Sequence, residues 1–239
     1  MQQTPGKIFL ADQRGTSETT LFSRFSTFNY GDFYQKHKQP MGNLFLLNEE
    51  TLAGSQSIKV EIDQNSHLVI FPLTGAVQVQ TAEQNLVLAD VGEVPVITVP
   101  AKTFICLKNP YEADSIHFLL LGIKAAQSVI ALNHPFFPFN FTDIENQLAP
   151  IIAGSKAPYV SSKLPFTLSL GRLAGRQETT FYLQEKKSIC FIFVLTGAFE
   201  AQGRLLHEKD GLALWDTDEV ELEALSNNAL VLVLELKPT

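Results

Sequence analysis

Short apolar runs, broken at close intervals by Gly, Asn and Asp, follow one another along most of the chain. Charged and apolar residues alternate from Glu219 to Glu223, as in a strand with one face in solvent. The stretches with the length and composition of strands are Val77–Gln80, Val94–Val99, Phe166–Leu170, Ala213–Leu225 and Ala229–Leu236. The pattern predicts a protein built mainly of β-strands.

Helical patterns are scarce along the chain. The best helix is predicted at Phe141–Ile152, because Thr142 followed three residues later by Glu145 is typical of a capping box. This helix lies in residues 133–159, which are rich in Pro and Phe and are predicted to link two halves of the chain.

The two halves contain the same sequence phrase. Residues 70–80 read IFPLTGAVQVQ and align without gaps with residues 192–202, IFVLTGAFEAQ, so that Gly75 corresponds to Gly197. A repeat of this size indicates a duplicated domain, and each glycine is expected in a tight turn after a buried strand. Two tandem antiparallel barrels or jelly rolls are therefore predicted, the alternative being two independent β-sandwiches that share a hairpin.

Composition and charge narrow the classes of partner. The chain has 239 residues, a formal net charge of −7 and a pI of about 5.2, so it repels phosphate backbones and no nucleic-acid partner is expected. No apolar run approaches the roughly 20 residues of a spanning helix, so no membrane partner is expected. Because the start of the chain does not read as a secretory signal and two cysteines form no disulfide framework, a cytoplasmic location is predicted.

Two regions, residues 21–124 and residues 166–236, resemble the pirin family of bicupins. Residues 22–28, FSRFSTF, are similar to the family's Ser-Arg-His-Thr-Phe-Ser-Phe, and residues 41–50 are similar to its segment ending Asn-Asp-Asp. Residues 166–236 resemble the family's C-terminal cupin, with Lys209-Asp210-Gly211 at its Gly-Asp-Gly turn. The resemblance implies an all-β chain of two tandem cupin barrels (double-stranded β-helix, or jelly-roll, folds) with few short helices. The expected domains are an N-terminal cupin at 1–132, a linker at 133–159 and a C-terminal cupin at 160–239.

The resemblance also implies a metal site, from which this sequence departs. Relatives carry a His-x-His pair and a distant His-x-Glu pair, and these align with Glu61 and Asp63 and with Cys106 and Lys108. None of the three expected histidines is present. Iron, copper and nickel sites usually need imidazole ligands, so the resemblance implies a degenerate site and no expected cofactor.

The four aligned positions, Glu61, Asp63, Cys106 and Lys108, are the candidate binding residues. Glu61 and Asp63 share one face of a strand, and Lys108 from a facing strand could place its ammonium where relatives hold the cation. Oxygen ligands alone would favour Mg²⁺, Mn²⁺ or Ca²⁺. Alternatively, the same strand alternates Ile58, Val60 and Ile62 with the charges, which places the apolar side inward and the charges in water. A one-residue change of register exchanges the faces, so the alignment and the pattern disagree here.

Three functions follow from these features. The first is a non-catalytic bicupin that binds a small molecule in the N-terminal barrel, or a protein partner. The second is a metal-dependent oxidoreductase of the family's quercetin 2,3-dioxygenase type, which the missing histidines disfavour. The third is a structural or regulatory protein-interaction partner, as the resemblance to pirin implies. His117 is interpreted as a hydrogen-bonded strand histidine rather than a ligand.

Overall fold

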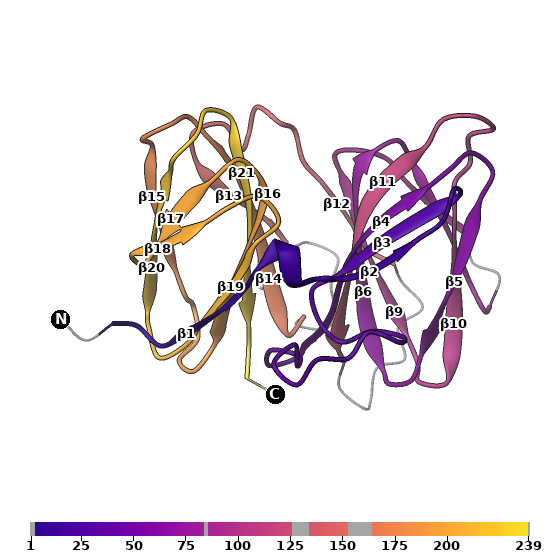
Figure 1. The fold of residues 1–239 in the computed structure, drawn as a ribbon, viewed down its shortest axis with the longest axis horizontal. Coiled ribbons are helices and arrows are strands. Elements are labelled where there is room, and N and C mark those ends of the chain that lie inside the picture. The colour runs from indigo at the N-terminus through magenta and orange to yellow at the C-terminus, as the bar shows by residue number, and fades with distance from the viewer. Residues whose placement is uncertain (1–2, 84–85, 126–133, 153–163, 239) are drawn as a thin grey trace. The chain divides into compact units, whose positions relative to one another are not determined.

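The computed structural model describes residues 3–83, 86–125, 134–152 and 164–238, and these form strands, turns and one short 3-10 helix, η1 (Ala11–Gln13). They fall into two compact units (Figure 1). The N-terminal unit comprises Gly15–Pro40 and Leu44–Pro138, and the C-terminal unit comprises the segment up to Arg14, Met41–Asn43 and the chain from Phe139 onward. No helix of the described residues is long and apolar enough to cross a membrane.

The N-terminal unit pairs a seven-stranded sheet, ordered β12-β9-β6-β11-β4-β3-β2, with a four-stranded sheet, ordered β5-β10-β7-β8. Its strands are β2 (Gly15–Glu18), β3 (Phe22–Ser26), β4 (Leu44–Leu52), β5 (Ser57–Ile62), β6 (Ser66–Thr74), β7 (Val77–Thr81), β8 (Leu86–Ala89), β9 (Glu93–Val99), β10 (Thr103–Lys108), β11 (Ile116–Lys124) and β12 (Phe136–Pro138).

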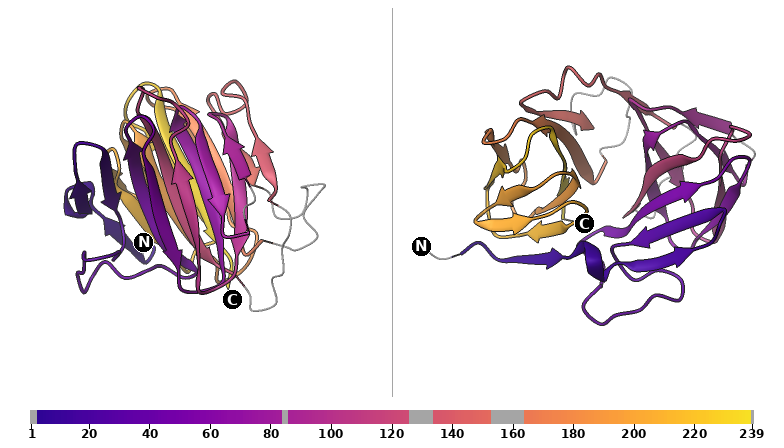
Figure 2. Two further views of the ribbon diagram at one scale, coloured as in Figure 1. Left: turned by 90° about the vertical axis from the view of Figure 1, so that its right-hand side faces the viewer. Right: turned by 45° about the horizontal axis from the view of Figure 1, so that its top comes forward.

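The C-terminal unit repeats this plan with sheets ordered β1-β19-β16-β21-β14-β13 and β15-β20-β17-β18. Its strands are β1 (Gly6–Phe9), β13 (Leu148–Ile152), β14 (Phe166–Leu173), β15 (Glu178–Tyr182), β16 (Ile189–Thr196), β17 (Phe199–Ala201), β18 (Arg204–Leu206), β19 (Gly211–Leu214), β20 (Glu219–Ala224) and β21 (Ala229–Leu236). The strands of each unit curve around their own interior (Figure 2), which confirms two cupin barrels.

The units interleave along the chain and do not follow the predicted ranges 1–132, 133–159 and 160–239. Strand β1 pairs with β19, so the first residues belong to the C-terminal unit although they precede the N-terminal one. Of the predicted linker, residue 133 and residues 153–159 lie outside the described residues.

Aliphatic side chains fill the interior of each barrel. In the N-terminal unit they come from both sheets and include Leu46, Val60, Ile105 and Leu120, all at most 2% exposed. The C-terminal interior is equally apolar. Burial of this apolar surface is the main favourable contribution to the stability of each barrel.

The sequence repeat forms the same hairpin in both units. Gly75 joins β6 to β7 with a φ of +70°, and Gly197 joins β16 to β17 with a φ of +82°. Glycine adopts this backbone without the steric cost that other residues incur, so the predicted tight turns are confirmed. The strand predicted at Ala213–Leu225 is divided into β19 and β20 by a turn at Asp216, where φ is +55°.

The prediction of a helix at Phe141–Ile152 is wrong. Residues 141–144 form a turn, and Leu148–Ile152 forms β13, which pairs with β14. Pro150 cannot donate the backbone hydrogen bond that a helix interior needs, and pairing with the edge of β14 satisfies the backbone groups of its neighbours. Thr142 therefore caps no helix.

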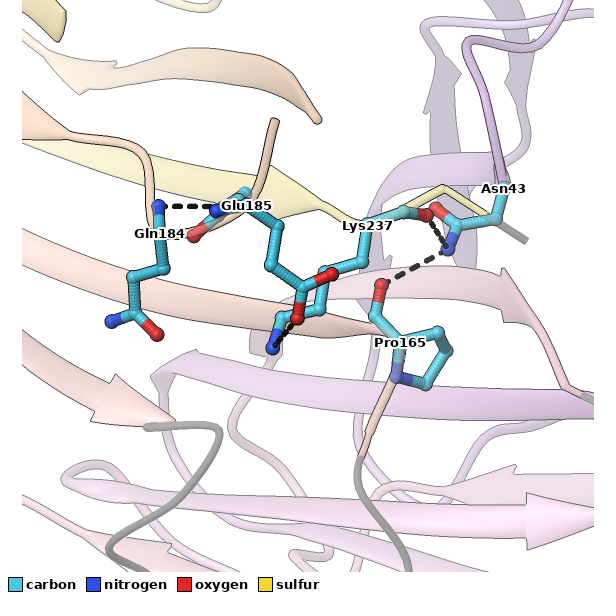
Figure 3. Close-up of polar contacts among 6 residues, drawn as sticks. Asn43, Pro165, Gln184, Glu185 and Lys237 are labelled. Atoms are coloured by element: carbon cyan, nitrogen blue, oxygen red, sulfur yellow. Dashed lines mark hydrogen bonds and ion pairs between the residues drawn. The ribbon is translucent and has the colours of Figure 1, made fainter. Parts of the chain in front are cut away.

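Buried polar groups secure the ends of the C-terminal unit's strands (Figure 3). The Asn43 amide donates to the carbonyl oxygens of Pro165, at 3.1 Å, and Lys237, at 3.4 Å. The fully buried Glu235 carboxylate accepts bonds from the backbone N–H groups of Gln184 and Glu185, both at 2.9 Å. These contacts hold the loop before β16 against β21.

We expect Gly197→Ala to destabilise the protein more than Gly203→Ala. Both glycines have positive φ, so alanine strains either backbone by about 1 kcal/mol. A Cβ at Gly203 meets no atom within 4 Å, whereas one at Gly197 collides with the Ser226 hydroxyl, which adds about 1–3 kcal/mol. Chemical denaturation of both variants measures the difference, and equal losses would contradict this account of the turn.

Candidate functional site

The four aligned residues lie on or beside the outer face of the small sheet of the N-terminal unit. The Glu61 side chain is 77% exposed, Asp63 and Lys108 are exposed, and Cys106 is half-buried. Cys106 lies opposite Lys59, whereas Lys108 lies opposite Ser57 and not opposite Glu61. The structure therefore does not bury Lys108 between the two carboxylates.

The inner face of the same two strands is aliphatic. Val60 and Ile62 of β5 and Ile105 and Leu107 of β10 are at most 3% exposed and belong to the barrel core. The side chains of β5 therefore alternate as the apolar pattern of the sequence indicates, with Val60 and Ile62 facing the core and the charged residues facing solvent. A binding role for Glu61, Asp63, Cys106 and Lys108 stays a prediction.

The histidines do not assemble into a metal site. Within the described residues, no group of three His, Cys, Asp or Glu side chains could hold an ion. His117 Nε2 lies 2.9 Å from Glu49 Oε1, which fits its interpretation as a hydrogen-bonded strand histidine. His67 contacts the Thr98 hydroxyl at 2.8 Å, and burial lowers its pKa to about 4, so this imidazole is neutral at pH 7.

A polar cluster interrupts the aliphatic interior where β3 and β4 pair. Arg24 of β3 lies directly opposite Glu50 of β4, and Asn48 is two residues before Glu50. These side chains share a face with the core residues Leu46 and Leu52, because residues two apart on a strand point the same way. The pairing of β3 with β4 therefore places an ion pair inside the barrel.

The ion pair is centred on a fully buried carboxylate. Arg24 Nε donates to Glu50 Oε1 at 2.6 Å, and the Asn48 amide donates to the same oxygen at 3.2 Å. Glu50 is 0% exposed, and its second oxygen, Oε2, has no hydrogen-bond partner in the described part of the chain. Burial raises the pKa of Glu50 to about 7, although Arg24 and Asn48 act in the opposite direction. This group is therefore partly protonated at neutral pH.

Arg24 also lines a pocket. It has a volume of about 240 Å³, and we name it the Arg24 pocket after its one cationic side chain. The lining residues with polar or aromatic side chains are Thr16, Ser17, Arg24, Ser26, Tyr30, Asp32 and Phe33. The guanidinium carbon lies 4.7 Å from the centre of the Tyr30 ring and 5.0 Å from that of Phe22, within the range of cation–π attraction.

A closed turn holds the aromatic side of the pocket. The backbones of Tyr30 and Phe33 bond to each other in both directions, at 3.1 and 3.0 Å, and Gly31 between them has a φ of +55°. Burial raises the pKa of Tyr30, with Arg24 opposing and Glu50, Glu61 and Asp63 adding to the shift, so the phenol keeps its proton at pH 7. The pocket thus combines a guanidinium with hydroxyl donors.

Comparisons with known proteins match both units. Residues 165–236 match the family model described as the quercetinase C-terminal cupin domain. The chain is 20% identical over 229 residues to a quercetin 2,3-dioxygenase of Escherichia coli K12, covering 95% of this chain and 97% of that protein. The crystal structure of YhhW from Escherichia coli superposes with a TM-score of 0.84 at 16% identity, covering 98% of this chain and 99% of that one. A second structure, of the bacterial pirin YhhW in complex with nickel(II), superposes with a TM-score of 0.83 at 17% identity, covering 98% and 100%.

The chain is similar to pirin-like bicupins over nearly its whole length. The order of the two sequence resemblances, the duplicated barrels and these matches over nearly the whole length agree. A quercetin 2,3-dioxygenase from Acinetobacter baumannii has the same fold, with a TM-score of 0.71 at 14% identity, covering 100% of this chain and 88% of that one.

Sequence reasoning missed the Arg24–Glu50 pair of this bicupin. Both residues lie in segments that resemble the family, but nothing local shows that they lie side by side. The available signal was the apolar alternation of Leu46 and Leu52, which places Asn48 and Glu50 on the inner face. A charged residue at an inward position of a strand calls for a buried partner.

We expect Arg24→Met and Lys108→Met to differ strongly in stability at pH 8. Arg24→Met leaves the buried Glu50 carboxylate without its cation, which costs about 3–5 kcal/mol. Lys108→Met removes an exposed charge and changes the free energy of unfolding by less than about 1 kcal/mol. Urea denaturation of both variants measures this, and a large loss for Lys108→Met would show that the cation is buried after all.

We expect Glu50→Gln to change how stability depends on pH. The folded pKa, about 7, lies above the ordinary value of 4.5, so between these values the native state holds a proton that the unfolded chain releases. The Glu50 contribution is therefore complete below pH 4.5 and lost as pH rises through 7, by on the order of 3 kcal/mol. Denaturation from pH 4 to 9 should show a steeper decline for the wild type than for Glu50→Gln. Glu145→Gln, in a more exposed ion pair, should follow the wild type.

Proposed function

We propose that this bicupin is a non-catalytic binding protein with a degenerate metal site, and that its ligand is a small molecule held by the N-terminal barrel. The observation that carries the proposal is the chemistry of β5 and β10. Their inward side chains are Val60, Ile62, Ile105 and Leu107, none of which can ligate a metal. The candidate oxygen ligands Glu61 and Asp63 are on the solvent side.

These residues do not fit the metal of the family. Transition-metal sites of this kind need convergent imidazole or carboxylate donors, and the outer face brings no histidine to Glu61 and Asp63. Lys59 instead lies 3.5 Å from Glu61, and its ammonium competes for that carboxylate. We therefore derive no reaction step that passes through a bound metal, and the absence of a resident cofactor is part of the proposal.

The Arg24 pocket supports a binding role. It joins a cation, several hydroxyl groups and two aromatic rings in one concave site, the usual makeup of a small-molecule site. At about 240 Å³ it is smaller than the typical pocket for drug-sized ligands, which favours a compact ligand. Binding of a protein partner and a cytoplasmic location stay predictions from the sequence.

We expect the purified protein to hold transition metal far below one equivalent, even after growth with iron, nickel, copper and manganese. Elemental analysis measures this, with the relative crystallised with nickel(II), YhhW, prepared in parallel as a positive control. Quercetin incubated with the protein in air should show no loss of absorbance above the buffer rate.

Near-stoichiometric metal together with flavonol turnover would replace this proposal with the quercetin 2,3-dioxygenase-type oxidoreductase. Metal without turnover would contradict the degenerate site alone. The two measurements therefore separate the two parts of the proposal.

A further inference from the structure

The duplicated barrels show that the fold does not need the Arg24–Glu50 pair. The hairpin glycine Gly75 approaches Ile116, and its counterpart Gly197 approaches Ala229. In the sheet register Ile116 lies opposite Leu52 of β4, and Ala229 lies opposite Leu173 of β14. Leu52 and Leu173 are therefore equivalent positions of the two units.

Two residues before these leucines, the barrels diverge. The N-terminal unit has Glu50, whereas the C-terminal unit has Gly171. The residue that pairs with Glu50 from the neighbouring strand is Arg24, and the one that pairs with Gly171 is Leu148, which packs against the apolar core. The same architecture thus closes with an aliphatic contact where the N-terminal unit has a buried carboxylate beside a guanidinium that is 16% exposed.

A buried ion pair is a poor way to stabilise a barrel, because its desolvation offsets much of the attraction. An apolar replacement at the same place, as in the C-terminal unit, avoids that cost. The pair therefore calls for a role other than stability. The unpartnered Oε2 of Glu50 points the same way, since buried polar atoms without partners are rare unless a proton, water or ligand is involved.

The Nη nitrogens of Arg24 determine which class of ligand the pocket can bind. Only Nε of Arg24 is bonded to Glu50, and among the described residues no hydrogen bond is made by its two Nη nitrogens. Two parallel N–H donors in one plane match the two oxygens of a carboxylate. The Ser17 and Ser26 hydroxyls lie on the strands beside Arg24, and the Tyr30 and Phe33 rings offer an apolar wall.

We propose that the Arg24 pocket binds a small organic carboxylate, with the carboxylate on the Nη edge of Arg24 and the organic part against Tyr30 and Phe33. This rests on the proposed function, because it names the ligand class of that binding protein. One lining carboxylate, Asp32, opposes an anion, but it is exposed and screened by solvent and salt.

Glu50 couples this binding to pH. When Glu50 is ionised it neutralises Arg24, and when it is protonated the guanidinium keeps an uncompensated charge for the ligand. Within the residues that the structure describes, three other side chains face the pair: Asn48 on the same strand as Glu50, Phe118 on β11 and the protonated Tyr30. The carboxylates of Glu61 and Asp63, at the end of β5, raise the pKa of Tyr30. Burial raises the pKa of Glu50 to about 7, so the carboxylate ligand should bind more tightly at pH 6 than at pH 8.

Benzoate is the probe, and benzamide is its neutral control of the same shape. We expect benzoate, and not benzamide, to bind the wild type at pH 6 in calorimetric or NMR titrations, and to bind about fivefold or more weakly at pH 8. Glu50→Gln should bind at pH 8 as the wild type does at pH 6. The exposed Arg176→Gln, outside the pocket, should leave binding unchanged.

The decisive comparison is between Glu50→Gln and the double variant Arg24→Gln with Glu50→Gln, because neither contains a stranded carboxylate. The double variant should bind benzoate at least about tenfold more weakly. Equal affinity of the two, equal binding of benzamide, or no benzoate binding to folded wild-type protein at pH 6 would overturn the inference.

These outcomes are separable from those of the metal analysis. A metal-free protein that ignores benzoate would overturn the carboxylate site and leave the degenerate metal site standing. A metal-loaded protein that binds benzoate through Arg24 would overturn the degenerate metal site and leave the carboxylate site standing.

Discussion

Strand parity in the N-terminal barrel is the constraint on which the rest of the structure depends. Two sheets close around aliphatic side chains, and each strand commits every second residue to that interior. On β5 this places Val60 and Ile62 inside and leaves Glu61 in solvent. On β4 the same rule places Glu50 inside with Leu52, because both have the same parity. The alternation of side chains along a strand therefore points the charge of Glu61 into solvent on β5 and the charge of Glu50 into the barrel on β4.

Much of the fold could be predicted because its signals are local. The hairpins of the repeat depend on Gly75 and Gly197, whose neighbours in sequence form the two strands. The helix predicted at Phe141–Ile152 failed because a capping motif is also local, while pairing with β14 is a contact with a distant segment. Local helix propensity is overridden where the exposed edge of a strand offers hydrogen-bond partners to the backbone.

The candidate site was harder to predict for the same reason. Arg24 and Glu50 are neighbours only because β3 and β4 pair in one register, which no pattern within either strand specifies. Alignment with the family directed attention to the positions of the missing histidines. At those positions the apolar alternation of β5 was the better guide, since a barrel interior tolerates a charge only when it has a partner.

The energetics of the duplicated barrels connect these observations. Burying Glu50 beside Arg24 desolvates the carboxylate fully and the guanidinium in part, and Gly171 beside Leu148 shows that the architecture is compatible with no charge at this place. The cost falls when Glu50 takes up a proton, which is why its pKa is raised to about 7 despite the adjacent guanidinium. Any anion that reaches Arg24 from the pocket favours that same protonated state, because it takes over the partner that the Glu50 carboxylate had. Desolvation offsets much of the attraction in such a pair, and the proposed carboxylate would change its charge state. Both properties suit a binding site better than a structural contact.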